Sequence, residues 1–470
     1  MKPASTKRSA PPAIELPAPA HAGWWASLIY ALCTLALAYP ALAGKFLVNP
    51  HSDQYIGGFP VREFAAASLK AGHGIPQWNP YLLGGLPYIA AMHGDIFYPT
   101  FILRALLPTD VALTWSFIIH LFLAGSFTYL FLRAWGVGFY GSLVGGLAYM
   151  LSGPIASYAS PGHDGKLYVS ALLPLVLFLL VRGVRDGRGW SWGALAIVIG
   201  LAVLSPHPQL LQYLLLTSGA FALYLAFAGH GDAGALPRSV AIRRLGYALG
   251  AVLLGGAIGA IQYLPVREYV PWSPRAGGKG YEFATSYSLP LEELVNTIVP
   301  QFSGLLDRYW GRNGIHLHSE YVGGTGFVFA LAGVIGGSWS SFRKFWLGVF
   351  VVSLLWALGS STPFYHLVYA IVPGSKFFRA PSTMMYVTML SLAVFAALGT
   401  DRVLARQVGT RYAIGWLIAA ALIALLGTSG ALTNAAHVVA NSFDTTGQRD
   451  QLVSANGPAL VFGALRYKSE

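Results

Sequence analysis

The sequence is poor in charge and in cysteine. Only 10% of its 470 residues are charged and 55% are apolar, which gives a mean hydropathy of +0.56. A soluble domain carries about 25% charged residues, so an ordinary soluble domain is excluded and an integral membrane protein is predicted. Cys33 is the only cysteine. A disulfide within the chain and a zinc site built from thiolates are therefore excluded as well.

Long apolar runs recur from Trp24 to the region of Gly430. A run of about 20 residues crosses a hydrocarbon core about 30 Å thick, and backbone groups in lipid must be hydrogen-bonded within the segment, which favours helices. We therefore expect an all-α polytopic membrane protein with about 11 transmembrane helices. The predicted spans are 24–44, 111–133, 136–152, 168–184, 190–204, 209–228, 245–264, 322–339, 345–359, 382–400 and 413–430.

The predicted spans divide the chain into three parts. Residues 1–22 are rich in Pro and Ala and are expected to form a disordered cytoplasmic tail. Residues 23–430 form the transmembrane domain, and residues 431–470 form a C-terminal segment on the outer side.

The formal charge of +12 would fit a nucleic-acid partner, but its distribution does not. With the N-terminus inside, the inner loops hold 15 basic and 4 acidic residues, whereas the outer segments hold 15 basic and 14 acidic residues. Nearly the whole excess thus follows the positive-inside rule. It is a signal of topology, and no nucleic-acid partner is needed to explain it.

Two outer segments, 45–110 and 265–321, are far longer than the other connections. Such irregular segments often carry binding and catalytic residues, so the working face is expected on the outside. Residues 61–69 predict a helix lying along the interface. Residues 361–382 are too broken by Pro and Gly to span the membrane.

Acids and histidines gather on this outer face. They are His51, Asp53, His93, Asp95, His163, Asp164, His207, Glu268, His316, His318 and Glu320. Any one of them could simply cap a helix or pair with a neighbour. Polar groups at membrane depth are costly and usually functional, so the set as a whole favours a site.

The residue types suggest acid–base chemistry and phosphate binding. Asp53 can accept a proton or bind a divalent cation through oxygen, and Asp95 is a candidate partner carboxylate for both roles. His163 and Lys166 form a compact group at the mouth of one span. Lys166 and Arg379 are cations suited to a phosphate head group, and we expect them to approach one cavity.

Aromatic side chains such as Trp78 lie at the same level as these polar groups. They fit an aromatic belt at the membrane interface, and they would equally stack against the apolar face of a sugar. The outer segment around Trp78 mixes rings, glycines and amides, which suits a carbohydrate groove better than a plain belt.

Six stretches in order resemble the YfhO-type bacterial membrane proteins, a family similar to the GT-C glycosyltransferases. They are "SDQY", "WNPYLLGGLPYIAAMHGDIFYP", "GHDGKLYVSALLPL", "SPHPQLLQYLLL", "YWG" followed by "EYVGG", and "FFRAPSTMMY". The resemblance covers roughly residues 24–410. It departs from the family at His93 and Asp95, where an amide and a small residue are expected.

The resemblance implies a GT-C-like fold in the bacterial inner membrane, with an extracytoplasmic site that transfers a sugar from a polyprenyl-phosphate donor to a cell-envelope acceptor. It implies that Asp53 is the first-loop acid, acting as base or metal ligand, and that Gln54 beside it contacts substrate. The other matching motifs supply further candidates: His163, Lys166, His207, Gln209, Glu320 and Arg379. Membrane lipids and other membrane subunits are the further partners expected.

Two functions remain open on these grounds. One is a glycosyltransferase with Asp53 as its base. The other is a non-catalytic membrane subunit or a lipid or glycolipid transporter. A transporter is expected to place polar residues near mid-membrane, whereas here the ionisable residues lie at span ends, except His120. This distribution favours chemistry at the outer surface.

Overall fold

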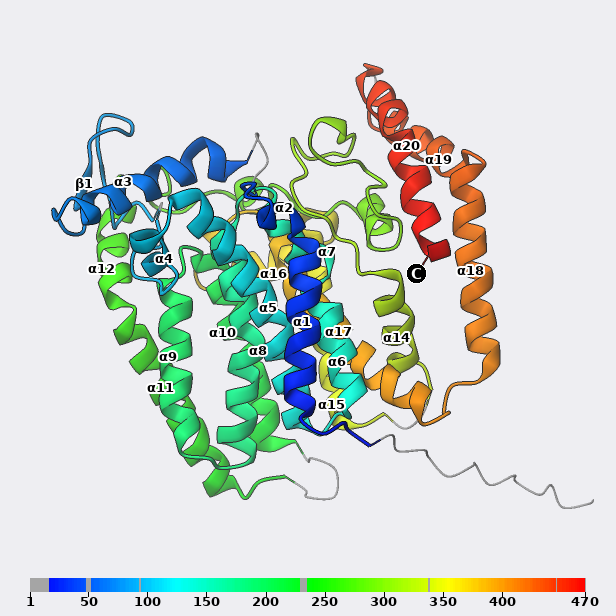
Figure 1. Ribbon diagram of the computed structural model, residues 1–470, viewed down its shortest axis with the longest axis horizontal. Coiled ribbons are helices and arrows are strands. Elements are labelled where there is room, and N and C mark those ends of the chain that lie inside the picture. The colour runs from blue at the N-terminus through cyan, green and yellow to red at the C-terminus, as the bar shows by residue number, and fades with distance from the viewer. Residues whose placement is uncertain are drawn as a thin grey trace, which may run out of the picture.

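The computed structural model describes residues 17–47, 52–92, 94–228, 235–336, 339–444 and 446–469. His51, His93, His230 and most of the expected N-terminal tail lie outside the described residues. The described chain is nearly all helical, with one two-stranded antiparallel hairpin, as Figure 1 shows.

The helices and strands follow the chain in this order: α1 (Ala22–Leu37), α2 (Tyr39–Leu42), α3 (Phe59–Lys70), β1 (Trp78–Asn79), β2 (Leu86–Pro87), α4 (Phe101–Leu106), α5 (Thr109–Trp135), α6 (Phe139–Met150), α7 (Gly153–Ala156), α8 (Asp164–Leu180), α9 (Trp190–Leu204), α10 (Pro208–Phe227), α11 (Arg238–Ile258), α12 (Ala260–Tyr269), α13 (Tyr281–Thr285), α14 (Gly324–Val334), α15 (Ser341–Leu358), α16 (Phe364–Ile371), α17 (Met385–Leu404), α18 (Thr410–Thr428), α19 (Ala431–Asn441) and α20 (Gln448–Ser469).

Seven helical segments among the described residues are long and apolar enough to cross a membrane. They are 109–135, 164–185, 208–227, 238–258, 341–361, 381–404 and 410–428. Helices α1, α9 and α14 are shorter apolar helices. The expected multi-helix membrane architecture is therefore confirmed, whereas only seven of the eleven predicted spans correspond to helices of spanning length among the described residues.

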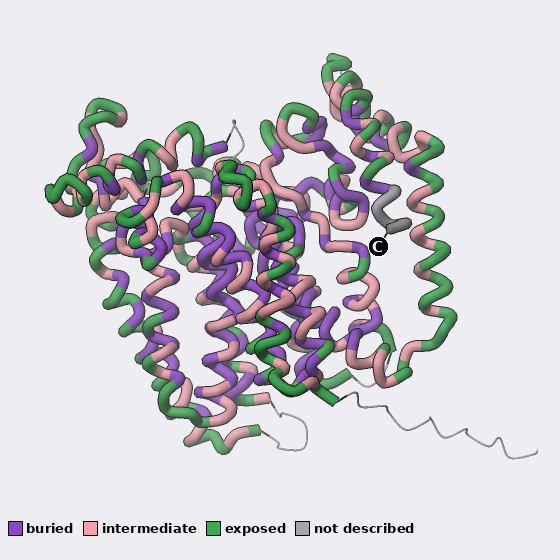
Figure 2. The backbone as a smooth tube through the Cα atoms, viewed as in Figure 1, coloured by how far each residue is buried: buried purple, intermediate pink, exposed green. Residues whose placement is uncertain are grey.

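Helices α8 and α17 form the centre of the bundle. In their most apolar stretches 83% and 89% of the residues are buried, whereas only 6% are buried in α18, which stands at the edge (Figure 2). Helix α17 packs closely on α14, where a Cβ at Gly399 would lie 1.8 Å from the carbonyl oxygen of Phe329. Small residues that let backbones approach are a common basis of helix packing in membranes.

The two long loop segments lie at the same end of the bundle (Figure 1). The first folds into a cap that contains α3, the hairpin and α4, and it has its own small core around Val61, Tyr88 and Phe101. The second reaches the C-terminal helices, where Val299, Phe302 and Trp310 pack with residues of α19 and α20. The segment after residue 430 is thus a helical pair that covers the second loop.

Candidate functional site

A polar cavity of about 390 Å³ lies between the cap and the ends of α8 and α10. Five of the residues expected at the site line it: Asp53, Gln54, His163, Lys166 and His207. They come from three segments that are far apart in sequence, around residues 53–58, 162–166 and 206–207.

Local geometry brings these segments together. The backbone N–H of Asp53 donates to the carbonyl of Pro161 at 3.1 Å. Gly162 has φ +76°, and a Cβ there would lie 2.1 Å from Cβ of Gln54, so only glycine permits this approach. Gln54 begins a π-helical turn that runs directly into α3. The turn before α8 and the start of α3 therefore form two adjoining walls of the cavity.

Asp53, His163, Lys166 and His318 form a hydrogen-bonded cluster. Oδ2 of Asp53 lies 3.0 Å from Nε2 of His163, and Nδ1 of His163 lies 2.8 Å from Nε2 of His318. Nζ of Lys166 lies 3.0 Å from Nδ1 of His163 and 3.1 Å from Nε2 of His318. The side chain of Asp53 is 72% exposed, so its carboxylate is open to a ligand.

The charges in this cluster are set by its geometry. The hydrogen bond from His163 lowers the pKa of Asp53, and the positive charges of Lys166 and Arg379 lower it further. Burial, followed by repulsion from Lys166, lowers the pKa of His163 to about 4. At neutral pH the pair is therefore an ionised carboxylate that accepts a hydrogen bond from a neutral imidazole.

Arg379 lies beside this cluster, although it is not among the residues that line the cavity. Its guanidinium carbon lies 5.3 Å from the ring centre of Tyr287. It is close enough to Lys166 for the two cations to repel each other, and its charge also acts on Asp53. Of the two cations expected to share a phosphate site, only Lys166 lines the cavity, while the charge of Arg379 acts on it from outside the lining.

Gln209 and His207 support the site through the backbone. Nε2 of Gln209 donates to the carbonyl of Arg379 at 2.6 Å, which ties the segment before α17 to α10. Nδ1 of His207 accepts from the backbone N–H of Leu210 at 3.4 Å and caps α10. Gln209 therefore positions Arg379 instead of lining the polar cavity.

Asp95 is placed differently from what the sequence suggested. It is 0% exposed and does not line the cavity. Its oxygens accept hydrogen bonds from Arg104 at 2.5 and 3.2 Å and from Arg62 at 3.1 Å. Arg62 also donates to Asp164 at 2.5 Å. The expectation that Asp95 assists Asp53 is therefore corrected. The Asp95 carboxylate is held by two arginines in a structural ion pair of the cap.

The proposed metal site does not fit these residues. Asp95 is neutralised by two guanidinium groups, and Asp53 faces Lys166 and Arg379, whose charges oppose a second cation. Within the described parts of the chain, no group of three or more His, Cys, Asp or Glu side chains could hold a metal ion.

Two other expected residues lie away from the polar cavity. Glu320 is buried and binds Nε2 of His316 through both carboxylate oxygens at 2.9 Å. Trp78 lies in β1 of the hairpin, where it is 54% exposed. Neither lines the polar cavity.

Arg62 and His318 are the site residues that the sequence left without a role. Arg62 lines the cavity and donates to Oε1 of Gln54 at 3.2 Å, while Nε2 of Gln54 is buried with no hydrogen-bond partner. The available signal was an arginine within the short apolar helix around residues 61–69. His318 was visible only as one of many outer histidines.

An apolar groove of about 410 Å³ adjoins the polar cavity. It runs between α10, α12 and the segment 372–378, and Met92 lines both spaces. Pro208 of the groove directly follows His207 of the cavity. The rest of its wall is largely apolar and is formed by Val203, Leu211, Leu215, Leu216, Tyr263, Val266, Val372 and Phe378. Gln212 and Gln262 are polar residues of the same wall.

No protein-family model matches the chain, and comparisons with curated proteins and with solved structures found no match either.

Proposed function

We propose that this protein is a GT-C-type membrane glycosyltransferase that moves a sugar from a polyprenyl-phosphate donor to a cell-envelope acceptor. The observation that carries the proposal is the junction at Met92 between a polar cavity and an apolar groove. A lipid-linked sugar has the same two parts. Its sugar phosphate suits the cavity beside Lys166 and Arg379, and its hydrocarbon chain suits the groove.

In the proposed reaction Asp53 acts on the acceptor. The acceptor hydroxyl oxygen attacks the anomeric carbon, the bond from that carbon to the phosphate oxygen breaks, and the proton passes to the Asp53 carboxylate. Negative charge grows on the departing phosphate, where fixed cations lower the barrier. Attack opposite the leaving group inverts the anomeric configuration. His163 orients Asp53 through its hydrogen bond.

The proposal includes a topology. In it the chain crosses the inner membrane of a bacterial cell eleven times, with the N-terminus in the cytoplasm and the segments 45–110 and 265–321 outside. This arrangement follows the distribution of basic residues. It puts the polar cavity at the extracytoplasmic end of the bundle.

A non-catalytic role as a lipid-binding membrane subunit is the second candidate. It is favoured by α18, in which only 6% of the most apolar stretch is buried, so that this helix offers an apolar surface to a neighbouring subunit at the edge of the bundle. Such a protein would bind the lipid donor without consuming it.

The test is donor consumption by the purified full-length chain in lipid nanodiscs, with a panel of polyprenyl-phosphate sugars. Asp53→Asn should slow transfer by about 10²–10⁴-fold, the usual contribution of a general base, while insertion and folding stay normal. The matched control is Glu282→Gln, which removes an exposed acid from the other loop segment. Normal transfer by Asp53→Asn would remove Asp53 from the mechanism, and donor binding without consumption by wild type would favour the subunit.

Lys166→Gln and Arg379→Gln test the phosphate site separately. Each should weaken donor binding, because each removes a cation from the cluster at Asp53. Lys45→Gln is the control, since Lys45 is exposed and does not line the cavity. Equal donor affinity in all three variants would contradict the phosphate site.

A further inference from the structure

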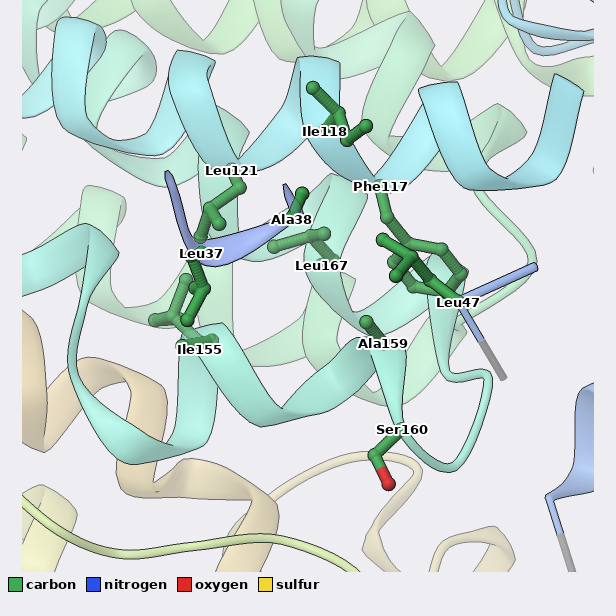
Figure 3. Close-up of a pocket in the computed structure, with 11 residues that line it drawn as sticks. Leu37, Ala38, Leu47, Phe117, Ile118, Leu121, Ile155, Ala159, Ser160 and Leu167 are labelled. Carbon is green, nitrogen blue, oxygen red and sulfur yellow. The ribbon is translucent and has the colours of Figure 1, made fainter. Parts of the chain in front are cut away.

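A third space, the α1–α5 pocket, lies next to the turn that leads into α8, and Figure 3 shows residues that line it. It has a volume of about 400 Å³. Its walls come from the C-terminal end of α1, from α5, from α7 and from the start of α8. The main lining residues are Leu37, Leu47, Phe117, Leu121, Ile155 and Leu167.

The α1–α5 pocket and the polar cavity share one wall. Ala159, Ser160 and Leu167 line the pocket, while residues 162–166 line the cavity. The hydrogen bond from the Asp53 N–H to Pro161 joins the two sides of that wall. Ser160 is the polar residue of the pocket and lies at its end, as Figure 3 shows. The apolar groove, by contrast, meets the cavity at a different place, where Met92 lines both spaces.

The depth of the pocket fits a hydrocarbon chain. Phe117 and Leu121 lie ~12–18 Å along α5 from its first residue, Thr109, at 1.5 Å per residue. This distance places them inside a helix that is long and apolar enough to span a membrane. Leu37 is 49% exposed, so the pocket opens beside α1 toward the surroundings of the bundle. In a membrane those surroundings are acyl chains.

We infer that the α1–α5 pocket binds the acyl chain of the acceptor, and that the acceptor is a lipid whose head-group hydroxyl reaches Asp53. The inference rests on the proposed function. The donor chain then lies in the apolar groove and the acceptor chain in the α1–α5 pocket, with the Asp53–His163 pair between them. The products are a glycosylated lipid and polyprenyl phosphate, and the hydroxyl proton leaves through the Asp53 carboxylate.

The test uses a diacylglycerol that carries a photoactivatable diazirine on one acyl chain, added to the full-length protein in nanodiscs. We expect cross-links at residues 117–121 and 155–160. Leu37→Trp should lower this labelling by about tenfold. Keeping two methylene groups of the acyl chain out of the pocket lowers the affinity by roughly that factor. Leu32→Trp is the matched control, since Leu32 is an exposed leucine of the same helix outside the pocket. Ala156→Phe also narrows the pocket, from the side of α7, and replaces Leu37→Trp in the experiment if that variant does not fold.

Transfer is measured in the same samples, with the lipid and with a water-soluble sugar as acceptors. Loss of labelling and of lipid glycosylation in Leu37→Trp, with both retained in Leu32→Trp, supports the inference. Labelling spread evenly over the exposed faces of α11 and α18 overturns it. Transfer that favours the soluble acceptor and is unchanged in Leu37→Trp overturns the acceptor assignment alone. Labelled pocket residues without any transfer overturn the proposed function and the acceptor assignment with it.

Discussion

Arg62 connects the wall of the polar cavity to the interior of the cap. Its guanidinium donates to Asp95, Asp164 and Gln54, and all four side chains are buried. Buried charges are stable only when they are paired, so removing one partner leaves another charge uncompensated.

Arg62→Ala should therefore destabilise the protein by about 3–5 kcal/mol, the usual effect of breaking a buried ion pair. Thermal unfolding in detergent measures this change. Glu63→Ala, at the exposed neighbouring position on α3, should leave the unfolding temperature nearly unchanged. Similar unfolding temperatures for the two variants would show that the buried network contributes little.

Single residues also show which parts of the candidate site could be predicted from the sequence. That Asp53, His163 and Lys166 share the outer face could be expected, because each lies near the outer end of a predicted span. The burial of Asp95 could not be expected, since its pairing with Arg104 depends on how the cap folds back on itself. The same holds for His318, which reaches His163 across 155 residues of chain.

At the scale of elements, the segment 291–320 contains two buried groups that hold their protons tightly. Burial raises the pKa of Glu293 to about 7 from 4.5. Burial alone would lower the pKa of His316. The attraction of the Glu320 carboxylate is stronger, and it raises the pKa of His316 to about 9 from 6.5. Both groups bind protons more strongly in the folded than in the unfolded protein. The stability that Glu293 contributes is therefore lost as the pH rises from 4.5 to 7, and that of His316 as the pH rises from 6.5 to 9.

Hydrogen exchange of residues 291–320 should therefore become faster between pH 6 and pH 9, after correction for the intrinsic rate. Glu293→Gln should reduce the part of this change that occurs below pH 7, because the amide stays neutral. Glu292→Gln is the control, since Glu292 forms a more exposed pair with Arg312. A segment that becomes more protected with rising pH would contradict this assignment.

The contact between α14 and α17 gives a second prediction at this scale. Gly399→Ala places a methyl group against the Phe329 carbonyl and forces the helices apart, which should cost about 1–3 kcal/mol. Gly415→Ala on α18 has open space around it and should be neutral or slightly stabilising. Thermal unfolding compares the two, and equal stability would mean that α14 and α17 separate without cost.

The helices themselves were predictable from the sequence because apolar runs of spanning length leave few alternatives. Their ends were less predictable. Helix α14 ends at Val334, whereas the expected span continued to residue 339, and α8 begins four residues earlier than expected, at Asp164. Such ends depend on local turns and on neighbouring segments, which a hydropathy pattern does not contain.

At the scale of the whole molecule, the proposed topology can be tested with fusion reporters. A reporter after Arg188, Arg244 or Arg406 should be cytoplasmic, and one within residues 275–318 should be extracytoplasmic. The expectation follows from the excess of basic residues in the inner loops. A reversed result at any of these positions would place the polar cavity on the wrong side of the membrane for the proposed reaction.

The unpaired amide of Gln54 has a consequence for substrate choice. Its Nε2 is buried without a hydrogen-bond partner, while its Oε1 accepts a hydrogen bond from Arg62, so the amide cannot turn over without losing that bond. A ligand that offers an oxygen there satisfies the donor, and one without it leaves a buried N–H unpaired at about 1–3 kcal/mol. That difference corresponds to roughly 5–150-fold in selectivity. In the proposed transfer reaction, two sugars that differ in a single hydroxyl would then be distinguished by one side chain of the cavity wall.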